Sequence, residues 1–137
     1  MNKTLTVVVA VAFAGAAIWW VKNRQDSPTT GEPIVQVVLP SSLPPMAERG
    51  KTAFDANCAS CHGPNGSGRD GLAPPLIHKI YEPSHHSDMA FALAVRQGVR
   101  AHHWRFGSMA PVEGVSDASI EAITAYIREL QRANGIH

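Results

Sequence analysis

Cysteine is scarce in this chain, whose 137 residues contain only Cys58 and Cys61. Two cysteines three positions apart cannot build a disulfide scaffold, and a structural zinc site would lack its second pair of ligands. An excess of one charge is lacking too, since 12 basic and 11 acidic residues leave a net charge of +1. We therefore predict no nucleic-acid partner, because such partners require a basic surface.

Strand-like alternation of apolar and polar residues and internal repeats are also missing from the sequence. Without them a sheet or a repeat array is not expected, and the remaining periodic segments have helical spacing. The length suits one domain with additional segments. We predict a mostly α fold: one helical domain, preceded by a single N-terminal apolar helix and a proline-rich linker.

Both cysteines belong to one motif, Cys58-Ala59-Ser60-Cys61-His62, which reads C-x-x-C-H. This spacing is typical of covalent haem attachment. The two thiols can reach the two vinyl groups on one side of a haem and form thioethers, and the next imidazole can bind the iron. The ligand is a neutral imidazole whose second ring nitrogen needs an acceptor. We predict one haem c, attached to Cys58 and Cys61, with His62 as an axial ligand of the iron.

Other interpretations of the motif explain less of it. A redox dithiol expects a thioredoxin-like βαβ pattern, which the sequence does not show. A simple disulfide leaves His62 unexplained.

An uncharged apolar segment runs from Thr4 to Val21, and 18 residues lie near the lower limit for a bilayer-spanning helix. The segment is long for the apolar part of a cleaved signal peptide. We predict a membrane anchor or signal segment over residues 1–22, favouring the uncleaved anchor, then a linker over 23–45 and the haem domain over 46–137. The apolar run 34–39 is either an extended segment lying on the haem domain or part of a semi-rigid tether.

The orientation of the anchor follows from the haem motif. The count of basic residues around the segment slightly favours the opposite orientation. Covalent haem attachment of this kind belongs to the outer face of the bacterial membrane. We therefore predict a single-pass inner-membrane protein with a periplasmic haem domain, or a soluble periplasmic protein if the segment is cleaved.

Three segments carry helix signals: 46–57 after two prolines, 88–97, and a last helix that begins after Ser116 and ends before Gly135. Gly50 lies inside the first of them, where a glycine costs about 1 kcal/mol relative to alanine. Close approach of another backbone explains such a residue best. The last helix has one apolar stripe, made by Ile120, Ile123, Ile127 and Leu130.

The iron needs a second ligand or keeps an open site, and that choice decides function. Met109 lies in a loop between a glycine and a proline, just before the last helix, and a thioether raises the reduction potential. Met46 is too close to the motif, and Met89 is predicted to be a core-packing residue of the helix 88–97. We predict that Met109 is the second axial ligand.

Histidines compete for the same position, and the candidates considered after the motif are His78, His85, His86, His102 and His103. A lone surface histidine usually faces solvent. We interpret the pair His102-His103 as a polar rim near the haem propionates, with a copper or partner-docking role as the alternative.

Over about residues 46–134 the chain resembles the class I, mono-haem c-type cytochromes of bacteria. The resemblance rests on positions in and around the motif: Gly50, Phe54, Cys58 to His62, Pro74 to Leu76, Met109 and Tyr126. It implies that the first and last helices cross at Gly50 and pack on Tyr126, and that Pro74 gives its carbonyl to His62. One departure is the alanine between Met109 and the next proline, where many members have the proline directly.

These features predict a one-electron carrier and not an enzyme, because six ligands on the iron leave no place for a substrate. The alternatives are a haem enzyme or gas sensor with an open distal site, and a haem subunit of a larger membrane respiratory complex. The expected partners are the membrane, through the N-terminal helix, and redox proteins. In residues 46–137 two lysines and seven arginines balance four aspartates and five glutamates, so net charge should steer those encounters weakly.

Overall fold

The computed structural model describes residues 31–137, so the anchor or signal segment predicted over 1–22 and residues 23–30 of the predicted linker lie outside it. Within this range the fold is mostly helical, as predicted, with two isolated β-bridges. No helix between residues 31 and 137 has the length and apolar character needed to cross a membrane. The elements in chain order are α2 (Pro45–Asn57), α3 (Ala59–His62), η1 (Pro64–Gly66), η2 (Lys79–Tyr81), α4 (Asp88–Gln97) and α5 (Asp117–Ala133).

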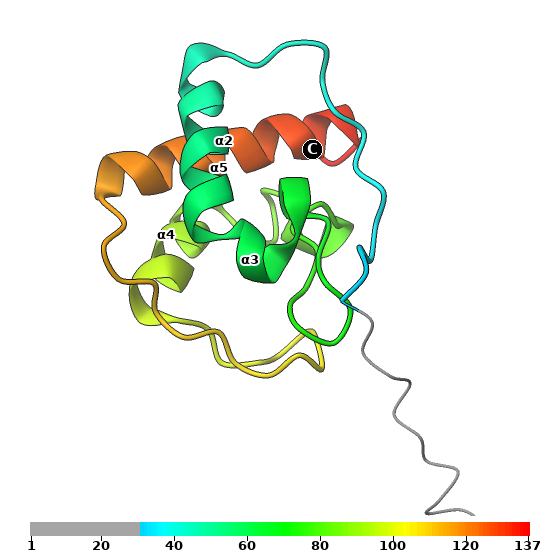
Figure 1. Cartoon of the computed structure of the whole chain (residues 1–137), viewed down its shortest axis with the longest axis vertical. Helices are drawn as coiled ribbons and strands as arrows, with labels where there is room; N and C mark the ends of the chain where they lie inside the picture. Colours follow the sequence, from blue (N-terminus) through cyan, green and yellow to red (C-terminus); the bar gives the residue numbers. More distant parts are fainter. Residues whose placement is uncertain (1–30) are drawn as a thin grey trace, which may run out of the picture.

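The first and last helices, α2 and α5, cross at the centre of the molecule (Figure 1). Gly50 lies at this crossing, where an added Cβ would overlap the carbonyl of Ala122 and lie 2.9 Å from Cβ of Tyr126. One turn further along α2, the Phe54 ring packs on the Tyr126 ring with centroids 5.7 Å apart. The glycine therefore permits the close approach that its position predicted.

Helix α5 contributes most of the core. The four residues of its predicted apolar stripe are all buried, as are Phe54 and Tyr126. The helix begins as predicted, because the Ser116 hydroxyl accepts a hydrogen bond from the Ser119 N–H at 3.2 Å. Such a cap satisfies one of the free N–H groups of the first turn and contributes about 1 kcal/mol. The start and the buried face of α5 are thus both encoded locally.

The apolar run 34–39 lies on the helical domain. Val35 and Val37 pack against the buried core, and Val38 exchanges two hydrogen bonds of 2.9 Å with the Asn134 side chain at the end of α5. In Figure 1 the chain before α2 passes beside the C-terminal end of α5. Of the two interpretations of this run, the extended segment on the domain agrees with the structure.

Helix α4 has the predicted bounds, Asp88–Gln97, and packs beside α5. The role predicted for its methionine is wrong, because Met89 is 61% exposed and not a core residue. The apolar residue of this helix that contacts the buried core is Phe91. A methionine is flexible and only weakly penalised at a surface, so its identity alone did not reveal which face was buried.

We expect Gly50→Ala to lower the free energy of unfolding by about 1–3 kcal/mol, because the new methyl group meets the backbone of α5 and overpacks the crossing. Urea unfolding followed by circular dichroism measures the change. Thr52→Ala, which places the same methyl group at an exposed position of α2, is the control and should change stability by less than about 0.5 kcal/mol. Equal stability of the Gly50 variant and the parent would show that the two helices do not approach this closely.

Candidate functional site

The C-x-x-C-H motif begins where α2 ends. The Cys58 N–H donates to the Phe54 carbonyl at 2.8 Å and closes α2, and the next four residues form the short helix α3. The His62 N–H donates back to the Cys58 carbonyl at 2.9 Å. A continuous helical turn therefore carries both thiols and the imidazole, and it is anchored on the core through Phe54.

The two thiols are free, with Cys58 half-buried and Cys61 exposed. Burial, and then the neighbouring Cys61, raise the pKa of the Cys58 thiol to about 11. A reactive redox dithiol requires the opposite shift, because the thiolate is the nucleophile. The surroundings of Cys58 thus disfavour the redox-dithiol interpretation.

His62 has the arrangement expected of a metal-binding imidazole. Its Nδ1 lies 2.9 Å from the carbonyl oxygen of Pro74, so that Nδ1–H donates and Nε2 keeps its lone pair. Burial lowers the pKa of His62, an effect opposed by the hydrogen bond to Pro74. The neutral, ligand-competent form of this imidazole is therefore favoured at pH 7.

The loop between His62 and Pro74 is fixed by its backbone. The Gly68 N–H donates to the His62 carbonyl at 2.7 Å, and an antiparallel bridge joins Arg69 to Ala73, the residue before Pro74. Gly68 has φ +76°, and an added Cβ would lie 2.6 Å from the nitrogen of Pro75. The backbone contacts of the loop after the motif thus fix the position of the Pro74 carbonyl, which accepts the hydrogen bond from His62.

Asn65 is a residue of this loop that sequence reasoning missed. It has a left-handed backbone, with φ 55° and ψ 24°, and its Oδ1 accepts a hydrogen bond of 2.8 Å from the Tyr126 hydroxyl. Asparagine tolerates this conformation better than most residues. The contact spans 61 positions and ties the loop to α5, whose Tyr126 also packs on Phe54.

Met109 lies at the base of a loop formed by residues 100–108. Its N–H and C=O each form a 2.9 Å hydrogen bond with Val99, and its side chain is half-buried. Gly98, at φ +74°, packs its Cα against the Met109 carbonyl, leaving no room for a side chain. The backbone of Met109 is therefore held on both sides, whereas Met46 is an exposed residue of the first turn of α2.

Arg69 has a buried guanidinium nitrogen without a partner. Within residues 31–137 its Nε is a buried side-chain N–H that makes no hydrogen bond. Native proteins rarely leave such a donor unpaired, and a guanidinium group prefers a carboxylate. This donor belongs to the loop that holds Pro74, and it fits a bound group that carries a carboxylate.

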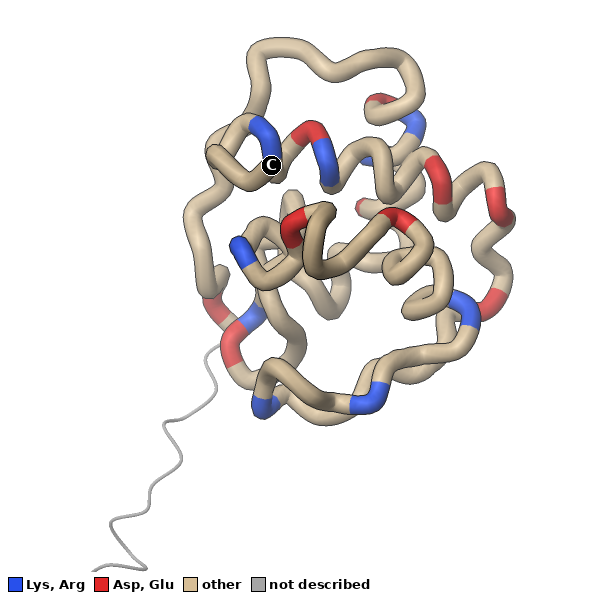
Figure 2. The backbone as a smooth tube through the Cα atoms, turned by 180° about the vertical axis from the view of Figure 1, so that it is seen from behind, with Lys and Arg blue, Asp and Glu red and all other residues tan. Residues whose placement is uncertain are grey.

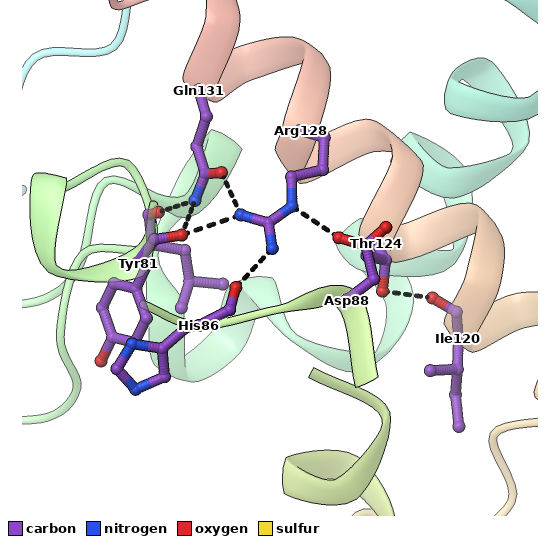
Figure 3. Close-up of polar contacts among 8 residues, drawn as sticks. Tyr81, His86, Asp88, Ile120, Thr124, Arg128 and Gln131 are labelled. Atoms are coloured by element: carbon purple, nitrogen blue, oxygen red, sulfur yellow. Dashed lines mark hydrogen bonds and ion pairs between the residues drawn. The ribbon is translucent and has the colours of Figure 1, made fainter. Parts of the chain in front are cut away.

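Arg128 joins the last helix to the chain between η2 and α4 (Figure 3). The buried guanidinium donates to the carbonyls of Tyr81 and His86 at 2.8 and 2.5 Å, and to the Asp88 carboxylate at 2.7 Å. It also donates to the Gln131 side chain, whose amide donates to the Tyr81 carbonyl at 3.1 Å. The sequence did not reveal these contacts, because Tyr81, His86 and Asp88 lie 40 or more positions away and two of the contacts are to backbone carbonyls.

The five histidines that were considered as competing iron ligands occupy two places. The Nδ1 of His78 accepts a hydrogen bond from the Ile80 N–H, and its ring packs edge-on against Trp104. The other four form one cluster at the surface, made by His85, His86, His102 and His103. The polar-rim interpretation of His102 and His103 stays a prediction.

Comparison with known proteins relates the chain to c-type cytochromes. A family model described as Cytochrome c matches residues 47–131, a range that includes the motif, Pro74 and Met109. The chain is also 38% identical over 60 residues to the Cbb3-type cytochrome c oxidase subunit CcoP of Azospirillum brasilense. That alignment covers 40% of this chain and 20% of the relative's length. No solved structure matches the chain.

We expect Arg128→Leu to lower the free energy of unfolding by about 2–5 kcal/mol, because the carbonyls of Tyr81 and His86 lose a charged donor. Arg96→Leu is the matched control. Arg96 also pairs with an aspartate, but both side chains are largely exposed, so its removal should cost only about 0–1 kcal/mol. Thermal or urea unfolding compares the two, and equal costs would contradict the role assigned to Arg128.

Proposed function

The chain belongs to the cytochrome c family, whose domain carries a covalently bound haem c, and on this premise we propose that it is a one-electron carrier with a single haem. When bound, the haem iron supplies the chemistry by cycling between Fe(III) and Fe(II). The observation that carries the proposal is the hydrogen bond from His62 Nδ1 to Pro74, which leaves Nε2 free to bind a metal. The residues of the chain would attach the haem, orient the two ligands of the iron and prevent other molecules from binding the iron.

Cys58 and Cys61 would hold the haem through two thioethers, and His62 would supply the first ligand of the iron. The three residues lie on one helical turn anchored by Phe54. Arg69 is assigned to a haem carboxylate, because its buried Nε otherwise lacks an acceptor. Pro74 acts through His62 by fixing the tautomer and orientation of the ring.

Met109 is proposed as the second axial ligand. Its backbone is held by the Val99 bridge and by the packing of Gly98, so a methionine there is positioned with little freedom. A thioether favours ferrous iron and closes the position that an enzyme or gas sensor would keep open. Because no position on the iron would then be open to a substrate, we propose an electron carrier.

We expect Met109→Ala to remove the weak far-red absorbance band of a sulfur–Fe(III) bond, to lower the reduction potential and to let the ferrous protein bind carbon monoxide. Met89→Ala makes the same substitution at an exposed position of α4 and should change none of these properties. Absorbance spectroscopy with and without carbon monoxide, and a redox titration, measure the effects. If Met109→Ala leaves the spectrum unchanged, Met109 is not the ligand.

The location of the protein is part of the proposal. The uncharged run Thr4–Val21 supports an uncleaved inner-membrane anchor, and the haem domain is then periplasmic. We expect the full chain in the membrane fraction, whereas a variant that lacks residues 1–26 and carries a cleavable export signal should be soluble and retain its haem. A mature protein that begins near Ile18 would contradict the anchor and indicate a soluble periplasmic carrier.

A second candidate function is a haem subunit of a larger membrane respiratory complex. The observation that favours it is the similarity to CcoP, a subunit of a cbb3-type oxidase. Residues 46–137 carry as many basic as acidic positions, spread over several elements (Figure 2), so net charge favours neither candidate. Native electrophoresis of solubilised membranes separates them, because a free carrier migrates alone and a subunit comigrates with its complex.

A further inference from the structure

Four histidine rings from two separate segments meet at the surface. His85 and His86 precede α4, whereas His102 and His103 belong to the loop that follows Val99. The ring centroids of His85, His86 and His103 lie 4.7 to 5.4 Å apart, and His102 is 4.1 Å from His103. Neither the predicted haem ligation nor the core uses these rings.

The backbone beneath both segments is fixed. The N–H groups of His85 and His86 donate to the Glu82 carbonyl at 3.0 and 2.8 Å, and the His86 carbonyl accepts from Arg128. Figure 3 shows the His86 carbonyl directed at Arg128 and its ring beside Tyr81. The loop 100–108, which carries His102 and His103, is closed at its base by the Val99–Met109 bridge. The histidines are therefore brought together by ordered elements.

The ring of His86 has the second contact that metal-binding histidines usually make. Its Nδ1 lies 2.7 Å from the Ile80 carbonyl oxygen, so that Nδ1–H donates and Nε2 keeps its lone pair. One nitrogen from each of His85, His86 and His103 lies within 4.8 Å of the other two. Nitrogen ligands of one tetrahedral zinc ion are about 3.3 Å apart, given bonds of about 2.0–2.1 Å. Small rotations of the exposed His85 and His103 side chains cover the difference.

We propose that His85, His86 and His103 form a binding site for one divalent transition-metal ion of the Zn²⁺ or Cu²⁺ class, separate from the haem. Imidazole suits these ions, whereas Mg²⁺ and Ca²⁺ require oxygen ligands, and the ligand cluster contains no carboxylate. Three imidazoles leave a fourth coordination position for water or an exogenous ligand.

A bound metal would join the segment before α4 to the loop whose base is Met109. The site therefore ties together two surface segments, which also meet through the hydrogen bond from Trp104 Nε1 to the Tyr81 hydroxyl at 3.1 Å.

Calorimetric titration of the full-length holoprotein, purified without a polyhistidine tag, with Zn²⁺ tests the site. We expect saturable binding of one ion per chain. His85→Ala and His103→Ala should each weaken binding by about tenfold or more, since even the loss of an outer-shell partner costs about 10–100-fold in metal affinity. Zn²⁺ should raise the thermal unfolding midpoint of the parent more than that of either variant.

His137→Ala is the matched control, because it removes an exposed histidine outside the cluster and should leave Zn²⁺ affinity unchanged. An unaltered haem absorbance spectrum shows that each variant is folded and loaded. The proposal is overturned by an absence of saturable Zn²⁺ binding in the parent, or by equal affinities of the parent, His85→Ala and His103→Ala. Neither result would affect the electron-carrier proposal, because the cluster shares no ligand with His62 or Met109.

Discussion

The hydrogen bond between His62 Nδ1 and the Pro74 carbonyl is the contact on which the functional site depends. It selects the tautomer, orients the ring and leaves Nε2 free to bind a metal. The contact requires the loop 63–73 to return to the motif, which it does through the Gly68 and Arg69 backbone bonds. The same loop is tied to α5 by Asn65 and Tyr126. The imidazole of the five-residue motif is thus held in a metal-competent form by contacts with the loop after it.

The rigidity of that site comes from the crossing of α2 and α5. Gly50 allows the two backbones to touch, and Phe54, which lies one turn before the motif, packs there on Tyr126. An electron carrier benefits from such a frame, because its site should change little between oxidation states. On the other face of α5, Arg128 donates to the chain before α4 and so orders the segment that carries His85 and His86.

Much of the fold and part of the site could be predicted from sequence because their signals are local. The bounds of α4, the cap at Ser116 and the buried stripe of α5 follow from spacing and short-range chemistry. The contacts of Asn65 and Arg128 could not be predicted, because their partners are up to 61 positions away or are backbone carbonyls. The exposure of Met89 was predicted wrongly for a related reason, since a helix with apolar residues on several sides does not reveal which face is covered. The histidine cluster likewise needed two loops to be placed in space.

Mass spectrometry of the denatured holoprotein shows whether the motif holds one haem covalently. We expect an intact mass equal to the chain plus one haem. After proteolysis, the added mass should remain on the peptide that contains Cys58 and Cys61. An unmodified chain from a haem-loaded preparation, or a peptide in which the two cysteines form a disulfide, would contradict the account.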